Sequence, residues 1–220
     1  MTSISVVVPA RDESANIEAV LKDLAPLEAE RIVVDGGSMD DTMARARPHC
    51  EVLLSCKAGR ATQMNMGASV AKGELLWFVH ADTRVSARAL TALADIAQRG
   101  TWGRFDVRLS GDRWAFRVIE WFMNRRSCWT GVATGDQGIF VCREWFEAVG
   151  GFPDIPLMED VALSKCLRRK ARPWCLHQPL LASSRRWEQA GILRTVVLMW
   201  RLRLGYFLGV APENLAKSYR

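Results

Sequence analysis

Closely spaced cysteines and long apolar runs are both absent from this chain of 220 residues. Its six cysteines form no C-x-x-C pair, so neither a zinc site nor a disulfide framework is indicated, and a reducing cytoplasm is the expected environment. The first apolar stretch ends at Pro9 after only a few residues, which is too short for a signal peptide. No repeat or low-complexity segment interrupts the chain, and we expect one domain over residues 1–220.

Segments typical of strands and helices alternate along the first hundred residues. Apolar runs at 4–8, 31–34, 50–54 and 75–79 are typical of strands, and the longer runs indicate strands covered on both faces. Between these runs, apolar residues recur every three or four positions, as on one face of a helix. The alternation weakens after Gly100. This order predicts an α/β fold with a mostly parallel central sheet flanked by helices.

The loop after the first strand lacks the glycine patterns of common nucleotide-binding folds. The chain reads VPARDE there, without G-x-G-x-x-G or G-x-x-x-x-G-K-[ST], which disfavours a Rossmann dehydrogenase and a P-loop enzyme. Acidic residues follow three of the expected strands instead: Glu13, Asp35 and Asp82. Open α/β sheets bind ligands at the carboxyl edge of their strands, so we expect these carboxylates to converge there. For Asp82 alone, a helix cap or turn is an equally good interpretation.

Most of the formal net charge of +6 lies near the C-terminus, in residues 183–220. Within this part, arginines interrupt the apolar segment 192–204, which therefore cannot span a bilayer. Two interpretations stay open: an amphipathic helix that lies on an anionic membrane, or a helix packed on the domain with its arginines in solvent. Nucleic acid is not an expected partner, because the excess charge is concentrated at this one end.

Four motifs together resemble the family 2 glycosyltransferases of GT-A fold. They are VVVPARDE at 6–13, VVDGGSMDDT at 33–42, HAD at 80–82 in place of the usual D-x-D, and GGFPDIPLMEDVALSKCLRR at 150–169. Two further motifs are similar to a short, soluble bacterial subgroup: GDQGIFV at 135–141 and SSRRWE at 183–188.

The resemblance implies a Rossmann-like GT-A sheet and a division of the chain into three parts. Residues 1–100 are expected to bind a nucleotide sugar, 101–190 to form the acceptor and catalytic half, and 191–220 to form a C-terminal amphipathic helical extension. The expected enzyme is cytoplasmic, with peripheral contact at the inner face of the cell membrane through that helix as an open possibility.

The implied reaction is transfer of a sugar from a nucleotide diphosphate to an acceptor hydroxyl, with inversion. UDP-sugar is the default donor, and the acceptor is unknown, with a lipid-linked group among the candidates. Mg²⁺ or Mn²⁺ would neutralise the departing diphosphate, with Asp82 as its ligand. Asp160 is the implied general base, and Glu159 beside it orients or contacts the acceptor. Simple capping of a helix N-terminus is the alternative for this acidic pair.

The resemblance also assigns nucleotide and acceptor contacts. The nucleotide-binding residues are Pro9, Arg11, Glu13, Asp35, Gly37, Arg60 and Ala81. Asp35 is expected to accept a hydrogen bond from the base, and Arg60 to support the diphosphate, although a plain surface role for Arg60 stays open.

The implied acceptor-side residues are Gln137, Arg186 and Trp187. Trp187 would stack on a sugar or a lipid-linked group, or would simply belong to the core. His80 replaces the first acidic residue of D-x-D, and we favour a phosphate contact or a buried position over a metal ligand.

Two other function classes remain as alternatives. One is a nucleotidyltransferase on a similar fold, which the missing glycine-rich first loop disfavours. The other is a non-catalytic basic protein that binds a membrane or nucleic acid, in which the carboxylates only cap helices.

Overall fold

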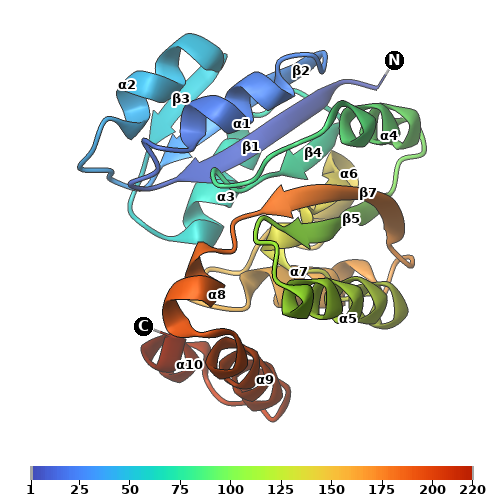
Figure 1. The fold of residues 1–220 in the computed structure, drawn as a ribbon. Coiled ribbons are helices and arrows are strands. Elements are labelled where there is room, and N and C mark those ends of the chain that lie inside the picture. The colour runs from blue at the N-terminus through green and yellow to red at the C-terminus, as the bar shows by residue number, and fades with distance from the viewer. Residues whose placement is uncertain (1, 220) are drawn as a thin grey trace.

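The computed structural model describes residues 2–219, apart from the side chain of Arg186. These residues form one seven-stranded sheet with the order β3-β2-β1-β4-β6-β5-β7 (Figure 1). The strands are β1 (Ile4–Ala10), β2 (Ala29–Asp35), β3 (Val52–Ser55), β4 (Leu75–Phe78), β5 (Trp102–Leu109), β6 (Phe140–Cys142) and β7 (Trp174–Ala182). Strands β1 to β4 are parallel, β5 is parallel to β7, and β6 runs antiparallel to both of its neighbours. The expected mostly parallel sheet is confirmed.

Helices cover both faces of this sheet and extend beyond one end of it (Figure 1). They are α1 (Ile17–Leu24), α2 (Thr42–Ala46), α3 (Arg60–Val70), α4 (Ala87–Ala97), α5 (Trp114–Thr130), α6 (Arg143–Ala148), α7 (Glu159–Leu167), α8 (Arg185–Ala190), α9 (Ile192–Phe207) and α10 (Pro212–Tyr219), with 3₁₀ turns η1 (Arg47–His49) and η2 (Gly135–Gln137). Side chains alternate along β1, so Val6 and Val8 pack with α1 and α4, whereas Val7 packs with α3 and α7. Because both rows are buried, the strand reads as a continuous apolar run.

One expectation about the cysteines is wrong. Cys128 in α5 forms a disulfide bond with Cys175 in β7. The two residues are 47 positions apart, so no spacing motif marks the pair in the sequence. They meet because α5 lies along β5, where Asn124 hydrogen-bonds the backbone of Val107, and β7 is the next strand. The bond fixes α5 to the edge of the sheet.

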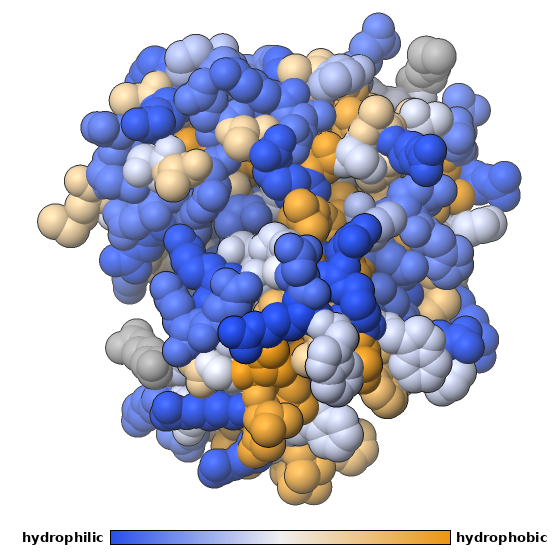
Figure 2. Space-filling model, viewed as in Figure 1, coloured by the Kyte–Doolittle hydropathy of each residue, from blue (hydrophilic) through white to orange (hydrophobic). Residues whose placement is uncertain are grey.

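The C-terminal helices form a separate group at one end of the molecule (Figure 1). Leu202 of α9 and Leu215 of α10 pack against Leu157 and Val161, which lie before and within α7. The outer surface of this end carries hydrophobic residues in the space-filling view (Figure 2). Within the described residues, no helix has both the length and the apolar character needed to cross a membrane.

A single buried amide joins the carboxyl ends of β1 and β2 to α3. Gln63 Nε2 donates hydrogen bonds to Ala10 O at 2.9 Å and to Val34 O at 2.8 Å. A Cβ atom on Gly36 would lie only 2.9 Å from Gln63 Oε1, so a larger residue at this position would force the Gln63 amide to shift. This tether fixes the strand edge at which the cavity described below is built.

We therefore expect Gln63→Ala to lower the free energy of unfolding by about 1 to 3 kcal/mol, because two buried carbonyls lose their donor. Urea unfolding followed by circular dichroism measures the change. The control is Gln98→Ala, which removes an exposed amide at the end of α4. Equal unfolding midpoints for the two variants would show that the tether contributes nothing.

Candidate active site

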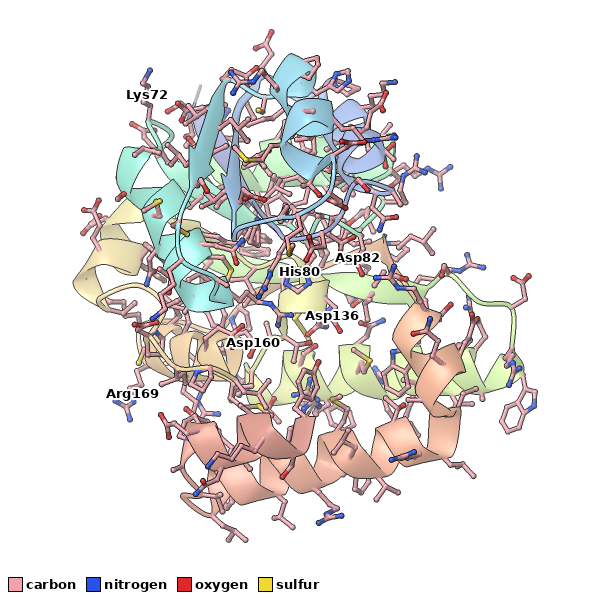
Figure 3. All side chains as sticks on the ribbon, turned by 90° about the vertical axis from the view of Figure 1, so that its left-hand side faces the viewer. Lys72, His80, Asp82, Asp136, Asp160 and Arg169 are labelled. Carbon is pink, nitrogen blue, oxygen red and sulfur yellow. A yellow bond between two sulfur atoms is a disulfide. The ribbon has the colours of Figure 1, made fainter. Side chains whose placement is uncertain are left out.

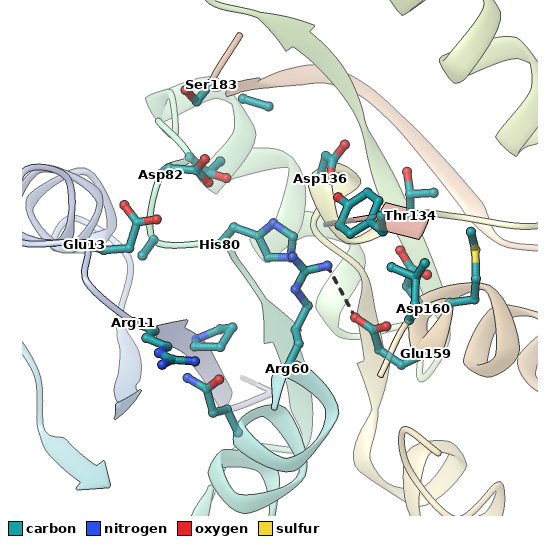
Figure 4. A pocket seen from close by; sticks show the side chains of 18 of the residues that line it. Arg11, Glu13, Arg60, His80, Asp82, Thr134, Asp136, Glu159, Asp160 and Ser183 are labelled. Atoms are coloured by element: carbon teal, nitrogen blue, oxygen red, sulfur yellow. Dashed lines mark hydrogen bonds and ion pairs between the residues drawn. The ribbon is translucent and has the colours of Figure 1, made fainter. Parts of the chain in front are cut away.

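A cavity of about 490 Å³ lies between the carboxyl edge of β1 and β4 and the helices α7, α8 and α9. The close-up in Figure 4 shows side chains from both sides directed into it. The lining includes these residues expected from the sequence: Pro9, Arg11, Glu13, Arg60, Ala81, Asp82, Glu159, Asp160 and Trp187. The expected convergence at the strand edge is therefore present for Glu13 and Asp82.

Asp82 follows β4 and lies in a strongly acidic part of the cavity. Burial raises the pKa of its carboxyl; the carboxylates of Glu13 and Asp136 raise it further, whereas His80 acts in the opposite direction. A carboxyl group with two acidic neighbours favours a bound cation, because the cation removes their mutual repulsion.

His80 is directed from the end of β4 toward η2 (Figure 4). Its Nε2 atom is buried and has no hydrogen-bond partner among the described residues. A Cβ atom on Gly135 would lie 2.6 Å from this nitrogen, so the ring and the turn are in close contact. Burial, followed by the charge of Arg60, lowers the pKa of His80 to about 4. The imidazole is therefore neutral near pH 7.

Asp160 and Glu159 open α7, and both line the cavity. The Asp160 carboxylate accepts from the backbone N–H groups of Gly135 at 2.7 Å and Val161 at 2.6 Å, which fixes its orientation. Glu159 is 2% exposed, and burial raises its pKa, as does the neighbouring Asp160. Its Oε1 atom lies 3.4 Å from Nη1 of Arg60. These contacts involve more than a helix cap, because they connect α7 to η2 and to α3.

Asp136 is a cavity residue that the sequence analysis missed. It lies in η2 and lines the cavity, whereas its neighbour Gln137 is fully buried behind the turn. Gln137 Nε2 donates to Ser127 Oγ at 2.9 Å, and its Oε1 accepts from the backbone of Thr134. The signal for it in the sequence is the acidic residue of GDQG, directly before the glutamine expected on the acceptor side.

Some expected residues are not brought to the cavity wall. Asp35 is 1% exposed, and its carboxylate accepts from the backbone N–H groups of Gly37 and Ser38 and from the Ser38 hydroxyl. Neither Asp35 nor Gly37 lines the cavity, so a direct contact with a base stays a prediction. The side chain of Arg186 lies outside the described part of the chain.

The α9 side of the cavity is apolar and basic. Met199 and Leu202 line it together with Arg203. Burial lowers the pKa of Arg203, although Asp160 and Asp136 oppose this effect. Burial, followed by the charge of Arg203, lowers the pKa of Arg126 in α5 to about 10. The cavity thus has one acidic side, near the strand ends, and one side where apolar and cationic groups meet. In Figure 3, His80, Asp82, Asp136 and Asp160 lie together in the region between the strand ends and the C-terminal helices.

The acidic residues of the cavity are candidate ligands for a divalent cation. Nowhere in residues 2–219 do three His, Cys, Asp or Glu side chains form a group that could hold a metal ion alone. Asp82 nevertheless supplies the hard oxygen that Mg²⁺ and Mn²⁺ prefer, in a region with excess negative charge. The residues fit a cation that takes its other ligands from water and from a bound anion.

The sequence model of the family named glycosyl transferase family 2 matches residues 5–147 of this chain, which include Glu13, Asp82 and Asp136. The chain belongs to this family. It is 23% identical to beta-monoglucosyldiacylglycerol synthase of Nostoc sp. over 229 aligned residues, covering 91% of this chain and 47% of that protein. The chain thus spans about half the length of the curated relatives that it matches first.

Solved structures of glycosyltransferases share the fold. TarS from S. aureus, residues 1–349, aligns with a TM-score of 0.66 and 18% identity, covering 83% of this chain and 60% of that one. The mannosyltransferase PcManGT from Pyrobaculum calidifontis, in complex with GDP-Man and Mn²⁺, aligns with a TM-score of 0.64 and 20% identity, covering 99% and 69%. The expected GT-A fold is confirmed.

The contact between Gly135 and His80 gives a prediction about the geometry of the site. We expect Gly135→Ala to lower the free energy of unfolding by about 1 to 3 kcal/mol, because the new methyl group overlaps a buried ring. In a His80→Ala background, where the ring is absent, the same change should cost less. A double-mutant cycle from thermal unfolding measures this coupling. Equal costs in both backgrounds would show that the ring and the turn are independent.

Proposed function

We propose that the chain is an inverting glycosyltransferase that uses a nucleotide-diphosphate sugar and a divalent cation, Mg²⁺ or Mn²⁺. The observation that carries the proposal is that Asp82 and Asp160 face one cavity from different elements, the end of β4 and the start of α7. One carboxylate lies among acidic groups that favour a cation, and the other is held by two backbone N–H groups. Such a transfer needs a cation that neutralises the leaving group and a base that takes the proton of the acceptor.

The donor is assigned to the strand edge. Pro9, Arg11, Glu13 and Ala81 line this part of the cavity and would surround the nucleotide. The buried carboxylate of Asp35 holds the Gly37 loop, so we assign both residues to shaping the pocket for the base. Arg60 is half-exposed toward the cavity, and its charge would support the diphosphate. The bound Mn²⁺ in the GDP-Man complex of PcManGT supports a metal-assisted donor site.

When bound at Asp82, the cation would supply positive charge to the departing diphosphate. The acceptor oxygen forms its bond to the anomeric carbon while the bond from that carbon to the diphosphate oxygen breaks. The proton of the acceptor hydroxyl passes to the Asp160 carboxylate, which its backbone contacts to Gly135 and Val161 hold in one orientation. Glu159, held near Arg60, orients the acceptor beside it.

The acceptor is assigned to the α8 and α9 side of the cavity. Trp187, Met199 and Leu202 present apolar surface there, next to the guanidinium of Arg203. This combination supports an acceptor with an apolar part, such as a lipid-linked sugar or alcohol. Gln137 would act on this side only through the turn that presents Asp136, because its own amide is buried.

The donor proposal predicts a metal-dependent stabilisation by one nucleoside diphosphate. Thermal unfolding is measured with UDP, GDP, ADP, CDP and dTDP, each with Mn²⁺ and with EDTA. A ligand at about 100 times its dissociation constant should add roughly 2.7 kcal/mol to the free energy of unfolding. Asp82→Asn should remove the metal-dependent part, and Asp95→Asn, an exposed change in α4, should not. An absence of any metal-dependent shift for all five nucleotides would contradict the donor site.

The general-base proposal predicts that Asp160→Asn slows sugar transfer by about 10² to 10⁴-fold, because the amide cannot take the proton. The measurement is release of nucleoside diphosphate from the matching nucleotide sugar. The amide oxygen of the asparagine can still accept one backbone hydrogen bond, so the start of α7 should stay in place. Nucleotide binding should therefore persist. Glu144→Gln is the control, because Glu144 is an exposed acidic residue in the first turn of α6. If both variants keep full activity, Asp160 is not the general base.

A further inference from the structure

Helix α9 has an apolar stripe on its outer face that no described residue covers. Large side chains recur every three or four positions and are strongly exposed, which places them on one side of the helix. They are Leu193 (82% exposed), Val197 (58%), Trp200 (73%), Leu204 (58%) and Phe207 (77%). The opposite side of α9 is packed, with Thr195 and Leu202 each 2% exposed. Hydrophobic colour gathers over this end of the molecule in Figure 2.

Helix α5 carries a second stripe of the same kind. Its exposed members are Trp114 (79%), Val118 (43%), Trp121 (53%), Phe122 (59%) and Trp129 (74%). The guanidinium of Arg125 lies over the rings of Trp121 and Trp129, at 5.4 and 5.6 Å from their centroids.

The two helices are neighbours. Ile119 and Met123 of α5 belong to the same hydrophobic cluster as Ile192 at the start of α9. Further along, Arg126 of α5 and Arg203 of α9 are close enough to repel each other. Figure 1 shows both helices in the lower part of the molecule.

The charges of α5 and α9 indicate which kind of partner covers the two exposed stripes. Arg125, Arg194 and Arg201 are exposed, whereas α9 has no acidic residue and Glu120 of α5 is buried and paired with Arg117. A second copy of this chain would bring arginines against arginines on this surface. Tryptophan and arginine beside aliphatic residues are instead the composition that binds the headgroup region of anionic membranes.

We propose that the two-helix surface, formed by the exposed stripes of α5 and α9, binds an anionic lipid bilayer. The apolar side chains enter the headgroup boundary, and the arginines meet lipid phosphates. The inner side of α9 provides Met199 and Arg203 to the cavity wall, so docking brings the acceptor side of the cavity close to the lipid. This inference goes beyond the proposed function, because the surface can bind lipid whether or not the cavity transfers sugar.

The experiment is co-sedimentation of the full chain with phosphatidylcholine vesicles that contain or lack phosphatidylglycerol. The chain should sediment with the anionic vesicles, and less so as salt rises. Trp200→Glu and Trp121→Glu should each weaken this binding about tenfold, because a charge replaces an inserted ring. Met39→Glu is the matched control: Met39 is 96% exposed but precedes α2 in the chain, and α2 lies at the opposite end of the molecule from α9 in Figure 1.

The sedimentation results either support or overturn membrane binding by the two-helix surface. Recovery of the chain in the supernatant with both kinds of vesicle overturns it, and so does equal binding by all three variants. A loss in Trp200→Glu without a loss in Trp121→Glu overturns the part assigned to α5. Sedimentation velocity without lipid tests the second copy: a dimer that Trp200→Glu dissociates, without vesicle binding, assigns the surface to self-association. The nucleotide shift is measured separately, so failure of the membrane surface and failure of the donor site are distinguishable.

Discussion

Repulsion among carboxylates is the constraint on which the cavity and its surroundings depend. Glu13, Asp82 and Asp136 come from three separate elements and share one partly dehydrated space. Burying an ion costs several kcal/mol, a large part of the 5 to 15 kcal/mol by which a typical domain is stable. Such a cluster persists only on a rigid support, here strands β1 and β4, which are covered on both faces. The same repulsion makes the site receptive to a cation, because binding one relieves it.

The local sequence pattern was enough to predict the part of the site that follows β1 and β4. Both strands are buried on both faces, so they read as uninterrupted apolar runs, and the acidic residues after them could be assigned to one edge. The same pattern predicts that Asp35, which ends β2, also lies in the site, but neighbouring backbone groups bind its carboxylate instead. The N–H groups of Gly37 and Ser38 lie next in the chain and occupy its carboxylate, so the residue shapes a loop and does not line the cavity.

Other features depend on contacts between segments that are far apart in the chain, which no local pattern records. Asp136 faces the cavity while its neighbour Gln137 is anchored to Ser127 of α5, and the motif alone does not tell which of the two points inward. Arg203 reaches the acidic residues from α9, and the Cys128–Cys175 bond joins a helix to a strand over 47 positions. The family resemblance located the loops, whereas the orientation of each side chain required the tertiary structure.

Helix α9 has one packed side and one exposed apolar side, which is why its sequence leaves two interpretations open. The arginine-interrupted apolar segment indicated either a packed helix or a membrane-surface helix. Packing uses only one side of α9, through Thr195 and Leu202, because no other part of the described chain covers its outer side. The outer stripe stays in water, at a cost of roughly 25 cal/mol for each Å² of apolar area that a lipid surface would recover. Since the inner side of the same helix forms a cavity wall, any shift of α9 at a membrane would reach Met199 and Arg203 directly.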